Sequence, residues 1–460
     1  MIVIRKANAA NTANTFSAYA TPHHLHCTQS VRGKSAFNSV SASRQERTES
    51  SNCKPEFVSH QSRDYNDPHM HTHRQQHHHD GYNFERGLCF LAHRLSLICF
   101  EPQIYEYKLH KCYDFTNQTM GNAQPVIIGK DIGYAAHCLR EGKLIGVPTE
   151  TVYGLAASAT DAHAVAALYA AKRRPTSLPL ILHIASRKRL SDFASDVPDC
   201  AVKLADAFWP GPLTLVLPKK CSVADFVTGG SSQVALRVPQ HRLMVELLEH
   251  ISVPLVAPSA NPFGYISPTT PEHVHKHLGD RLAYIIDGGP CVLGIESTII
   301  GFECGRPTVY RHGALCIEDI EQVIGSVRCA RESKNARPQH LPGSSSSHYA
   351  PKKPLFSDVD RTFTPPYSLE EIGVLAFRTP WPNVPLYHQK VLSEQGCLIE
   401  AAHNLFDALH ALDELPIQAI VAEALPSRGM GRALRDRLTR ASHPKCILDS
   451  QSLIQQPNES

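Results

Sequence analysis

The stretch Lys143-Leu-Ile-Gly-Val-Pro-Thr-Glu-Thr-Val-Tyr-Gly-Leu155 joins an apolar, strand-like run to a turn that is rich in hydroxyl groups. Helical spacing follows over residues 161–173, with Asp161 as the expected N-cap and Pro175 just past the helix end. This helix closes on Lys172-Arg-Arg174, so positive charge gathers just before the next apolar run. A buried strand, a hydroxyl-rich turn and a cationic helix end indicate an α/β fold with a site for a phosphate-bearing small molecule.

Apolar runs alternate with helical patterns through the surrounding region, which predicts one α/β domain over residues 121–327. Thr270 followed by Pro271 predicts a helix start, and Gly279 predicts its end. We expect a further helix over 129–140 and short strands over 143–147, 180–184, 234–238, 255–257, 282–286 and 298–302.

A second, smaller α/β domain with a Rossmann-like order of elements is expected over residues 351–450. Residues 328–350 contain a Pro-Gly-Ser-rich run and are interpreted as a linker. We expect buried strands over 372–377 and 419–422, and helices over 399–412 and 432–441.

Residues 1–120 are polar and rich in His, Ser, Asn and Gln, which predicts a disordered extension. Its histidine tracts within 67–80 allow a transition-metal site, but a solvated tract fits better, so we expect no metal site. The first 45 residues carry basic residues and many serines but no Asp or Glu. That composition is typical of a mitochondrial transit peptide and also of ordinary disorder, so mitochondrial targeting is the alternative to a cytoplasmic location.

The composition of the whole chain excludes few functions. The 460 residues exceed what one hydrophobic core usually serves, and the net charge of +3 neither requires nor excludes nucleic acid as a partner. Fourteen cysteines without a C-x-x-C pair favour a reducing compartment. The longest early apolar run, residues 88–100, is too short to span a bilayer, so no membrane contact is expected.

Four cationic residues suit phosphate chemistry, which requires charge neutralisation and alignment: Lys172, Arg174, Arg237 and Arg311. Basic residues at a helix C-terminus also stabilise the helix dipole, so Lys172 and Arg174 have a structural alternative. The preceding hydroxyl-rich turn and the following strand favour the phosphate role. For Arg311 the alternative is an ordinary surface arginine.

Polar residues at the ends of the apolar runs complete the candidate site, and each has a structural alternative. Thr151 suits either a ligand contact or a turn cap, and His183 suits either a ligand contact or a strand core. Ser259-Ala-Asn261 is a small turning segment of a kind that is common in proteins. Thr269 stands at a helix N-terminus, where N–H groups attract phosphate, whereas Thr270 is better explained as the N-cap.

The order and spacing of these motifs resemble the threonylcarbamoyl-AMP synthase family over roughly residues 125–445. The resemblance implies a YrdC-like domain, built on a twisted mixed sheet with helices, followed by the family's Rossmann-like C-terminal domain. Lys172 and Arg174 match the family's K-x-R motif, and Ser259 and Asn261 match its S-x-N motif. The resemblance implies three sets of site residues: catalytic Lys172, Arg174 and Arg237; threonine-binding Thr151, His183, Arg237 and Ser297; and ATP-binding Lys172, Arg174, Ser259, Asn261, Thr269, Arg311 and Tyr349.

The activity that this resemblance implies is nucleotidyl transfer. L-Threonine, bicarbonate or CO2, and ATP with its Mg²⁺ would give threonylcarbamoyl-AMP and pyrophosphate. A downstream tRNA threonylcarbamoyltransferase would then use the product to make N6-threonylcarbamoyladenosine in tRNAs that read ANN codons. Contact with tRNA itself is a further expectation, which rests on the resemblance alone.

The chain departs from the family pattern at two places. Leu178 stands near a position where many relatives carry a lysine, so a phosphate contact is either missing or supplied by Arg173. Serines replace the basic and aromatic residues that usually precede His348-Tyr-Ala-Pro351, in which Tyr349 is expected to close the site over a labile intermediate.

Two other functions remain as alternatives. A carbamoyl-transfer enzyme would bring zinc-finger cysteine pairs and an acylphosphatase-like domain, and the sequence shows neither. An RNA-binding module would use a concave cationic surface and would lose affinity steeply with salt. The sequence contains no G-x-x-x-x-G-K-[ST] motif and no strand-linked G-x-G-x-x-G motif.

Overall fold

The structure is a computed structural model that describes residues 126–303, 305–330 and 347–442. The predictions for residues 1–120, including the histidine tracts and the targeting segment, lie outside the described residues. So does most of the predicted linker. In the described part of the chain, no helix is long and apolar enough to cross a bilayer.

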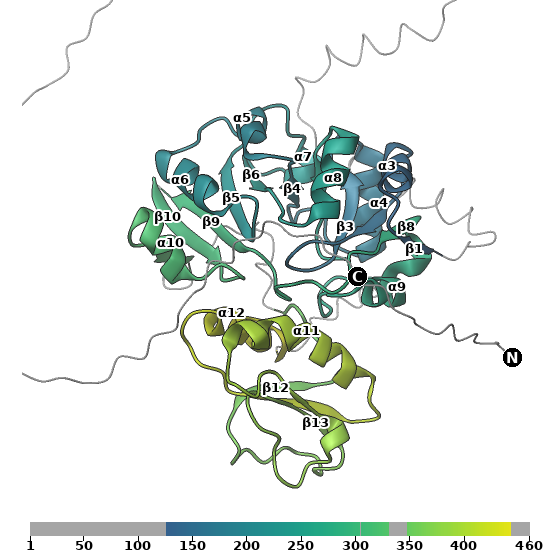
Figure 1. Cartoon of the computed structure of the whole chain (residues 1–460), viewed down its shortest axis with the longest axis vertical. Helices are drawn as coiled ribbons and strands as arrows, with labels where there is room; N and C mark the ends of the chain where they lie inside the picture. Colours follow the sequence, from purple (N-terminus) through teal and green to yellow (C-terminus); the bar gives the residue numbers. More distant parts are fainter. Residues whose placement is uncertain (1–125, 304, 331–346, 443–460) are drawn as a thin grey trace, which may run out of the picture. The chain divides into compact units, whose positions relative to one another are not determined.

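The first part of the described chain forms a mixed sheet, as the sequence predicted (Figure 1). Eleven strands of the described residues follow the order β1-β8-β2-β3-β7-β4-β6-β5-β9-β10-β11, with parallel and antiparallel neighbours. Their bounds are β1 Ile127–Gly129, β2 Ile145–Val147, β3 Gly154–Ser158, β4 Ile181–His183, β5 Leu213–Pro218, β6 Gln233–Arg237, β7 Leu255–Val256, β8 Tyr284–Ile286, β9 Thr298–Glu303, β10 Arg306–Arg311 and β11 Arg328–Cys329.

Strand residues alternate between two apolar cores, because successive side chains point to opposite faces of a sheet. Leu155, Ala157 and Ile285 belong to the larger core, whereas Ala156 and Tyr284 belong to the other. Helices α4, α6 and α9 contribute to the larger core, and α3 and α8 pack on the second. The helices of this part are α3 Ile132–Arg140, α4 Ala162–Lys172, α5 Leu190–Phe193, α6 Asp199–Phe208, α7 Asp225–Thr228, α8 Arg242–Ile251, α9 Pro271–Leu278 and α10 Ile317–Ile324.

The sheet face formed by β4, β6, β5 and β9 opposite the larger core carries only a small apolar cluster among the described residues. Ile181, Val216, Ala235 and Ile299 form this cluster, and Tyr310 packs against it. The polar residues that share their alternation are therefore free to face a cavity instead of a helix.

Helix α4 has the boundaries that the sequence predicted, and its end determines where the cationic residues go. Asp161 is the N-cap, and its carboxylate accepts hydrogen bonds from the N–H groups of His163 and Ala164. At the other end, Arg173 adopts a left-handed conformation with φ of 52°. The chain turns sharply there, so Lys172 stays on the helix while Arg174 lies beyond it.

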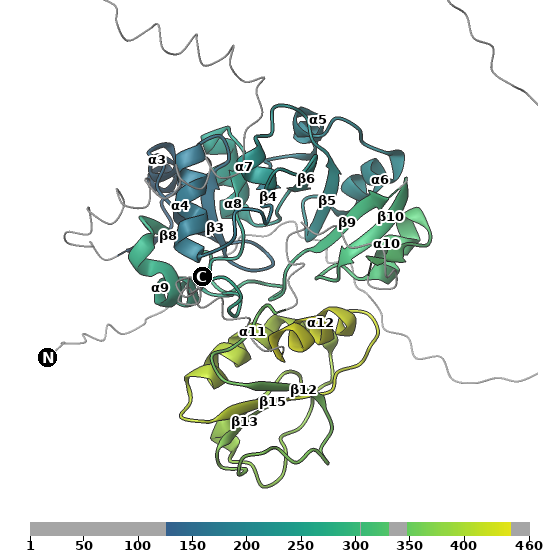
Figure 2. The same ribbon diagram turned by 180° about the vertical axis from the view of Figure 1, so that it is seen from behind.

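The second described part, residues 347–442, contains a four-stranded parallel sheet in the order β12-β15-β13-β14. Two helices, α11 and α12, lie on one face of this sheet (Figures 1 and 2). Its elements are β12 Leu355–Val359, β13 Ile372–Ala376, β14 Gln389–Val391, α11 Leu398–Glu414, β15 Ala419–Glu423 and α12 Gly431–Ser442. This confirms the predicted strands and helices of a small Rossmann-like unit.

Several elements differ from the prediction. Helix α3 begins at Ile132 instead of residue 129, because Asp131 caps it and residues 127–129 pair with β8. Arg328 and Cys329, inside the predicted linker, form β11 against β10. Strand β3 was missed because its Gly-Leu-Ala-Ala-Ser sequence has little β propensity, and helix α8 was missed although its apolar spacing is helical.

Candidate active site

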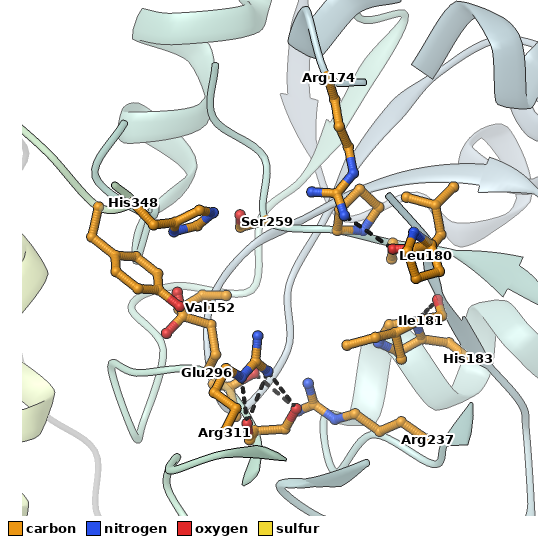
Figure 3. Close-up of a pocket in the computed structure, with 16 residues that line it drawn as sticks. Val152, Arg174, Leu180, Ile181, His183, Arg237, Ser259, Glu296, Arg311 and His348 are labelled. Atoms are coloured by element: carbon orange, nitrogen blue, oxygen red, sulfur yellow. Dashed lines mark hydrogen bonds between the residues drawn. The ribbon is translucent and has the colours of Figure 1, made fainter. Parts of the chain in front are cut away.

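A cavity that is open to solvent lies on the sheet face that lacks a large core. The structure brings together the following predicted site residues in its walls: Thr151, Arg174, His183, Arg237, Ser259, Ser297, Arg311 and Tyr349. Figure 3 shows Arg174 on one side of the cavity and Arg237 and Arg311 on the other.

Strand alternation places His183 and Arg237 in the cavity. His183 is paired with Arg237 across the parallel strands β4 and β6. Ile181 and Ala235 precede them by two residues and belong to the small apolar cluster, so all four side chains share one face. In the sequence, the signal for this placement was that each residue lies two positions after an apolar residue of the same strand.

Arg237 is a buried cation that is already paired with a carboxylate. Its Nη2 donates to Glu150 Oε1 at 2.7 Å and to Thr151 Oγ1 at 2.9 Å. The second oxygen of Glu150 accepts from Gln240 N at 2.9 Å. Arg237 therefore orients the Thr-Glu-Thr turn, and its positive charge is largely balanced inside the protein.

His183 is neutral in this environment. Its imidazole is almost fully buried, and its Nδ1 lies 3.2 Å from Ile181 O. Burial, with a smaller effect from the neighbouring Arg237, lowers the pKa of His183 to about 3. It can therefore act as a neutral hydrogen-bonding group, not as a cation.

A β-bulge turns Arg311 toward the cavity. Val309 pairs with Ile300, but Arg311 pairs with Ile299, so β10 has one extra residue at this point. Without the bulge, Arg311 would share the face of Val309, which belongs to the larger core. The Arg311 guanidinium instead donates to Ser297 O from Nε at 3.1 Å and from Nη2 at 2.8 Å.

Ser297 is the centre of a small hydrogen-bonded group in the wall. Its hydroxyl accepts from Arg311 Nη2 at 3.1 Å and lies 2.8 Å from the hydroxyl of Thr214. Ser297 is fully buried, so both partners hold it in one orientation. The cavity wall is therefore rigid around this hydroxyl.

Arg174 contributes positive charge from the opposite side. Its Nη2 donates to Pro179 O at 3.0 Å, and its guanidinium lies 5.8 Å from the ring centroid of Phe263. Burial, reinforced by Arg311, lowers the pKa of Arg174 to about 10, so it remains charged at neutral pH. Within the described residues, these contacts involve a carbonyl and an aromatic ring, not a carboxylate.

Lys172 and Asn261 support the cavity from behind and are not part of its lining. The buried Lys172 ammonium donates to the backbone carbonyls of Ser259 and Asn261. The Asn261 side-chain amide donates to Pro262 O at 2.9 Å and to Tyr265 O at 3.0 Å. The K-x-R and S-x-N motifs are therefore joined through Lys172, while Ser259 lines the cavity.

Thr269 and Thr270 lie at the start of α9. Thr270 is the N-cap, and its hydroxyl accepts from His273 N, as the sequence predicted. Thr269 is buried and lies outside the cavity lining, with its N–H directed to His273 Nδ1 at 3.4 Å. Its predicted contact with ATP remains a prediction.

Tyr349 and His348 reach the cavity from the second part of the chain. Tyr349 has φ of 64°, is buried, and stacks on Phe406 with 5.6 Å between ring centroids. The next residue, Ala350, donates its N–H to Gly264 O at 2.8 Å. Burial, with smaller effects of nearby arginines, lowers the pKa of His348 well below its usual value.

Two ionisable lining residues were not assigned from the sequence. His348 was quoted only as part of the segment around Tyr349, and Glu296 only as the neighbour of Ser297. Glu296 accepts from Ser267 Oγ at 2.5 Å and from Arg437 Nε at 3.0 Å. Its position next to Ser297 was the available signal in the sequence.

The cavity is suited to an anion. Arg174 and Arg311 face it while bonded to neutral groups, and Arg237 faces it as part of an ion pair. In the described residues, no cluster of His, Cys, Asp and Glu has the arrangement of a metal site.

Comparison with known families agrees with this geometry. Residues 137–313 match the family model described as Telomere recombination. Residues 315–443 match the model described as Threonylcarbamoyl-AMP synthase, C-terminal domain.

Relatives align with nearly their whole length. The chain is 40% identical over 324 residues to the threonylcarbamoyl-AMP synthase of Pyrococcus abyssi, covering 69% of this chain and 95% of the relative. It is 37% identical over 326 residues to that of Bacillus subtilis, covering 69% and 94%. The crystal structure of P. abyssi Sua5 complexed with L-threonine has a TM-score of 0.62 and 36% identity, covering 69% of this chain and 98% of that chain. This chain belongs to the threonylcarbamoyl-AMP synthase family of nucleotidyl-transferring enzymes.

Proposed function

We propose that this protein forms threonylcarbamoyl-AMP and pyrophosphate from L-threonine, bicarbonate or CO2, and ATP. The observation that supports this most strongly is the convergence of Arg174, Arg237 and Arg311 on one cavity that also presents buried hydroxyl groups. Arginine is well suited to phosphate and carboxylate because its planar guanidinium forms paired hydrogen bonds with both.

The threonine end of the cavity is proposed to be the wall around Arg237. Thr151, His183 and Ser297 provide hydroxyl and neutral imidazole groups beside the Arg237 guanidinium. Such groups suit an amino acid, which presents a carboxylate, an amine and here a hydroxyl. The structure of P. abyssi Sua5 complexed with L-threonine supports this choice of substrate.

The proposed chemistry requires alignment and charge neutralisation. The threonine amine attacks CO2 and loses a proton, which gives a carbamate. A carbamate oxygen then attacks the α-phosphorus of ATP, the bond to the bridging oxygen breaks, and pyrophosphate leaves with its electron pair. Arg174 and Arg311 would stabilise the phosphate charge from opposite sides of the cavity, and Mg²⁺ would enter with the ATP.

Tyr349 is proposed to close the site over these reactants. Its hydroxyl is buried and has no hydrogen-bond partner among the described residues. A buried hydroxyl without a partner is unfavourable, so a ligand atom in the cavity would satisfy it. The product would then pass to a tRNA threonylcarbamoyltransferase for the modification of ANN-decoding tRNAs.

The test is incubation of the purified protein with ATP, Mg²⁺ and bicarbonate, with and without L-threonine. Pyrophosphate release and mass spectrometry of the adenylate are the readouts. We expect threonine-dependent release, and we expect Arg174→Ala to lower kcat/KM by about 100-fold, because a charge-assisted hydrogen bond contributes about 1.5–3 kcal/mol. Arg187→Ala is the matched control, since Arg187 is an exposed arginine paired with Asp206 outside the cavity.

Other outcomes would identify the alternatives. Pyrophosphate release without any dependence on threonine would contradict the proposal. Affinity for RNA that falls steeply with salt, from protein that does not turn over ATP, would support an RNA-binding module instead. Consumption of carbamoyl phosphate in place of threonine and bicarbonate would support a carbamoyl-transfer enzyme.

A further inference from the structure

Arg437, in helix α12 of the second part of the chain, contacts the wall of the cavity. It is fully buried. Its Nε donates to Glu296 Oε2 at 3.0 Å, and its Nη1 donates to the backbone carbonyl of His312. Its guanidinium also lies 5.3 Å from the ring centroid of Tyr349. One side chain outside the large sheet therefore contacts the residue before Ser297 and the residue after Arg311.

Glu296 lies near two guanidinium groups, and the structure pairs it with one of them. Its Oε1 accepts from Ser267, and its Oε2 accepts from Arg437. Arg311, which also lies in the cavity wall, is bonded instead to Ser297. Figure 3 shows Glu296 and Arg311 close together in this wall.

Arg311 lies among several charged and titratable groups that affect its pKa. Burial has the largest effect on the pKa of Arg311 and lowers it. Among its neighbours, Tyr349 and then Glu296 raise this pKa, whereas Arg437 and Arg237 lower it. Arg437 is bonded to the Glu296 carboxylate, and Arg311 is a second buried cation near it, in an interior where burial strengthens charge interactions.

We propose that Arg437 is a positioning residue that holds the carboxylate of Glu296 and so keeps Arg311 available to an anionic ligand. This rests on the proposed function only in taking the ligand to be an anion, such as ATP. The second domain would thereby determine the charge of a cavity that lies mainly in the first.

The consequence of losing Arg437 follows from the charges that remain. A buried carboxylate without its partner is strongly unfavourable, so Glu296 would pair with Arg311. The Arg311 guanidinium would then be neutralised, and the cavity would carry a negative group where phosphate should bind. Affinity for anions would fall even though Arg311 itself is intact.

The experiment compares Arg437→Met, Glu296→Gln and the double variant. Gln at position 296 can still accept from Ser267 but carries no charge. Dissociation constants for Mg²⁺–ATP and for pyrophosphate are measured by calorimetry, and folding is checked by thermal unfolding. Arg435→Met is the matched control, because Arg435 lies on the same helix and pairs with Asp358 at 2.6 Å, away from the cavity.

We expect Arg437→Met to weaken ATP binding by about tenfold or more, which corresponds to about 1.4 kcal/mol. We expect Glu296→Gln and the double variant to bind within about threefold of the wild type, a difference below about 0.7 kcal/mol. Removing the negative charge of Glu296 should thus restore the ATP affinity that is lost when the positive charge of Arg437 is removed. A purely structural role, including the contact with Tyr349, would not be rescued in this way.

Three results would overturn the inference. They are unchanged ATP and pyrophosphate binding in Arg437→Met, a double variant as weak as Arg437→Met, and a double variant clearly weaker than Glu296→Gln. The last comparison decides the question even when Arg437→Met alone does not fold. If the wild-type protein binds pyrophosphate but not ATP, the proposed function is contradicted, and the role of Arg437 can still be tested with pyrophosphate. If it binds neither ligand, both the proposed function and the inference about Arg437 are overturned.

Discussion

At the scale of single residues, Lys172 shows how a motif can serve a site without lining it. Its side chain is 2% exposed, and burial lowers its pKa well below the usual value for lysine. Its ammonium group bonds to the backbone carbonyls of Ser259 and Asn261, the two residues of the S-x-N motif. Sequence alone allowed a phosphate contact or a helix-dipole contact, and the structure adds a third role as a brace for a loop.

We therefore expect Lys172→Met to lower the free energy of unfolding by about 3 kcal/mol, because two buried carbonyl groups lose their donor. Urea denaturation measures this change. Lys203→Met is the matched control, since Lys203 is an exposed helical lysine, and it should change stability by less than about 0.5 kcal/mol. Equal changes in the free energy of unfolding for the two substitutions would contradict the structural role of Lys172.

At the scale of elements, an irregularity in strand β10 and another at the end of helix α4 determine the positions of Arg311 and Arg174. The bulge in β10 turns Arg311 from the core face to the cavity face. The left-handed residue at the end of α4 separates Lys172 from Arg174. Both are local breaks in periodicity. A prediction from the sequence that assumes ideal helices and strands therefore cannot tell in which direction these side chains point.

The end of α4 also makes a prediction about stability. Arg173 has φ of 52°, a conformation that is unfavourable for residues with a Cβ atom, and its side chain is exposed. Arg173→Gly should raise the free energy of unfolding by about 1 kcal/mol, and Arg173→Val should lower it by a similar amount or more. Chemical denaturation of both variants measures these two changes in the free energy of unfolding. A less stable glycine variant would show that the Arg173 side chain has a role that outweighs its backbone strain.

At the scale of the whole molecule, a histidine cluster links α9 of the first sheet unit to α11 of the second. The His273 and His410 rings stack with centroids 4.0 Å apart, and His277 lies 5.3 Å from His410. His410 Nε2 lies 3.1 Å from Ser267 O, in the segment that leads to Thr269. Burial, followed by the charge of nearby His273, lowers the pKa of His410 to about 2.

This cluster makes stability depend on pH. Burial also lowers the pKa of His277 to about 4, and it lowers that of His273. Because these folded-state values lie below the unfolded value of about 6.5, the unfolded state binds more protons. Their contribution to stability is complete above about pH 6.5 and is lost as the pH falls below it. The charged groups around the cluster are Glu272, Lys276, Lys352, Asp407 and Glu414.

We expect the midpoint of thermal unfolding to fall between pH 7 and pH 5, with each buried histidine losing about 1–2 kcal/mol of its contribution. His410→Gln should flatten this dependence, because a glutamine can keep the contact with Ser267 but does not titrate. His163→Gln is the control at an exposed position. If the unfolding midpoint of His410→Gln depends on pH as steeply as that of the wild type, the pH dependence does not come from His410.

Much of the fold was predictable from local patterns. The N-caps Asp161 and Thr270, the apolar strand runs and the parallel second unit all follow from short-range propensity and periodicity, which act within a few residues. Strand β3 and the bulge in β10 were not predictable, because tertiary packing overrode weak local signals there.

The sequence by itself determined which chemical groups this protein has and in which elements they lie, and its motif order was sufficient to place the chain in a family. Only the tertiary structure decided which groups face the cavity. It turned Arg311 inward through a bulge, withdrew Lys172 behind a loop, and brought Arg437 to Glu296 across 141 positions of chain. The physical reason is that propensity is a property of neighbours in sequence, whereas burial and charge pairing depend on neighbours in space.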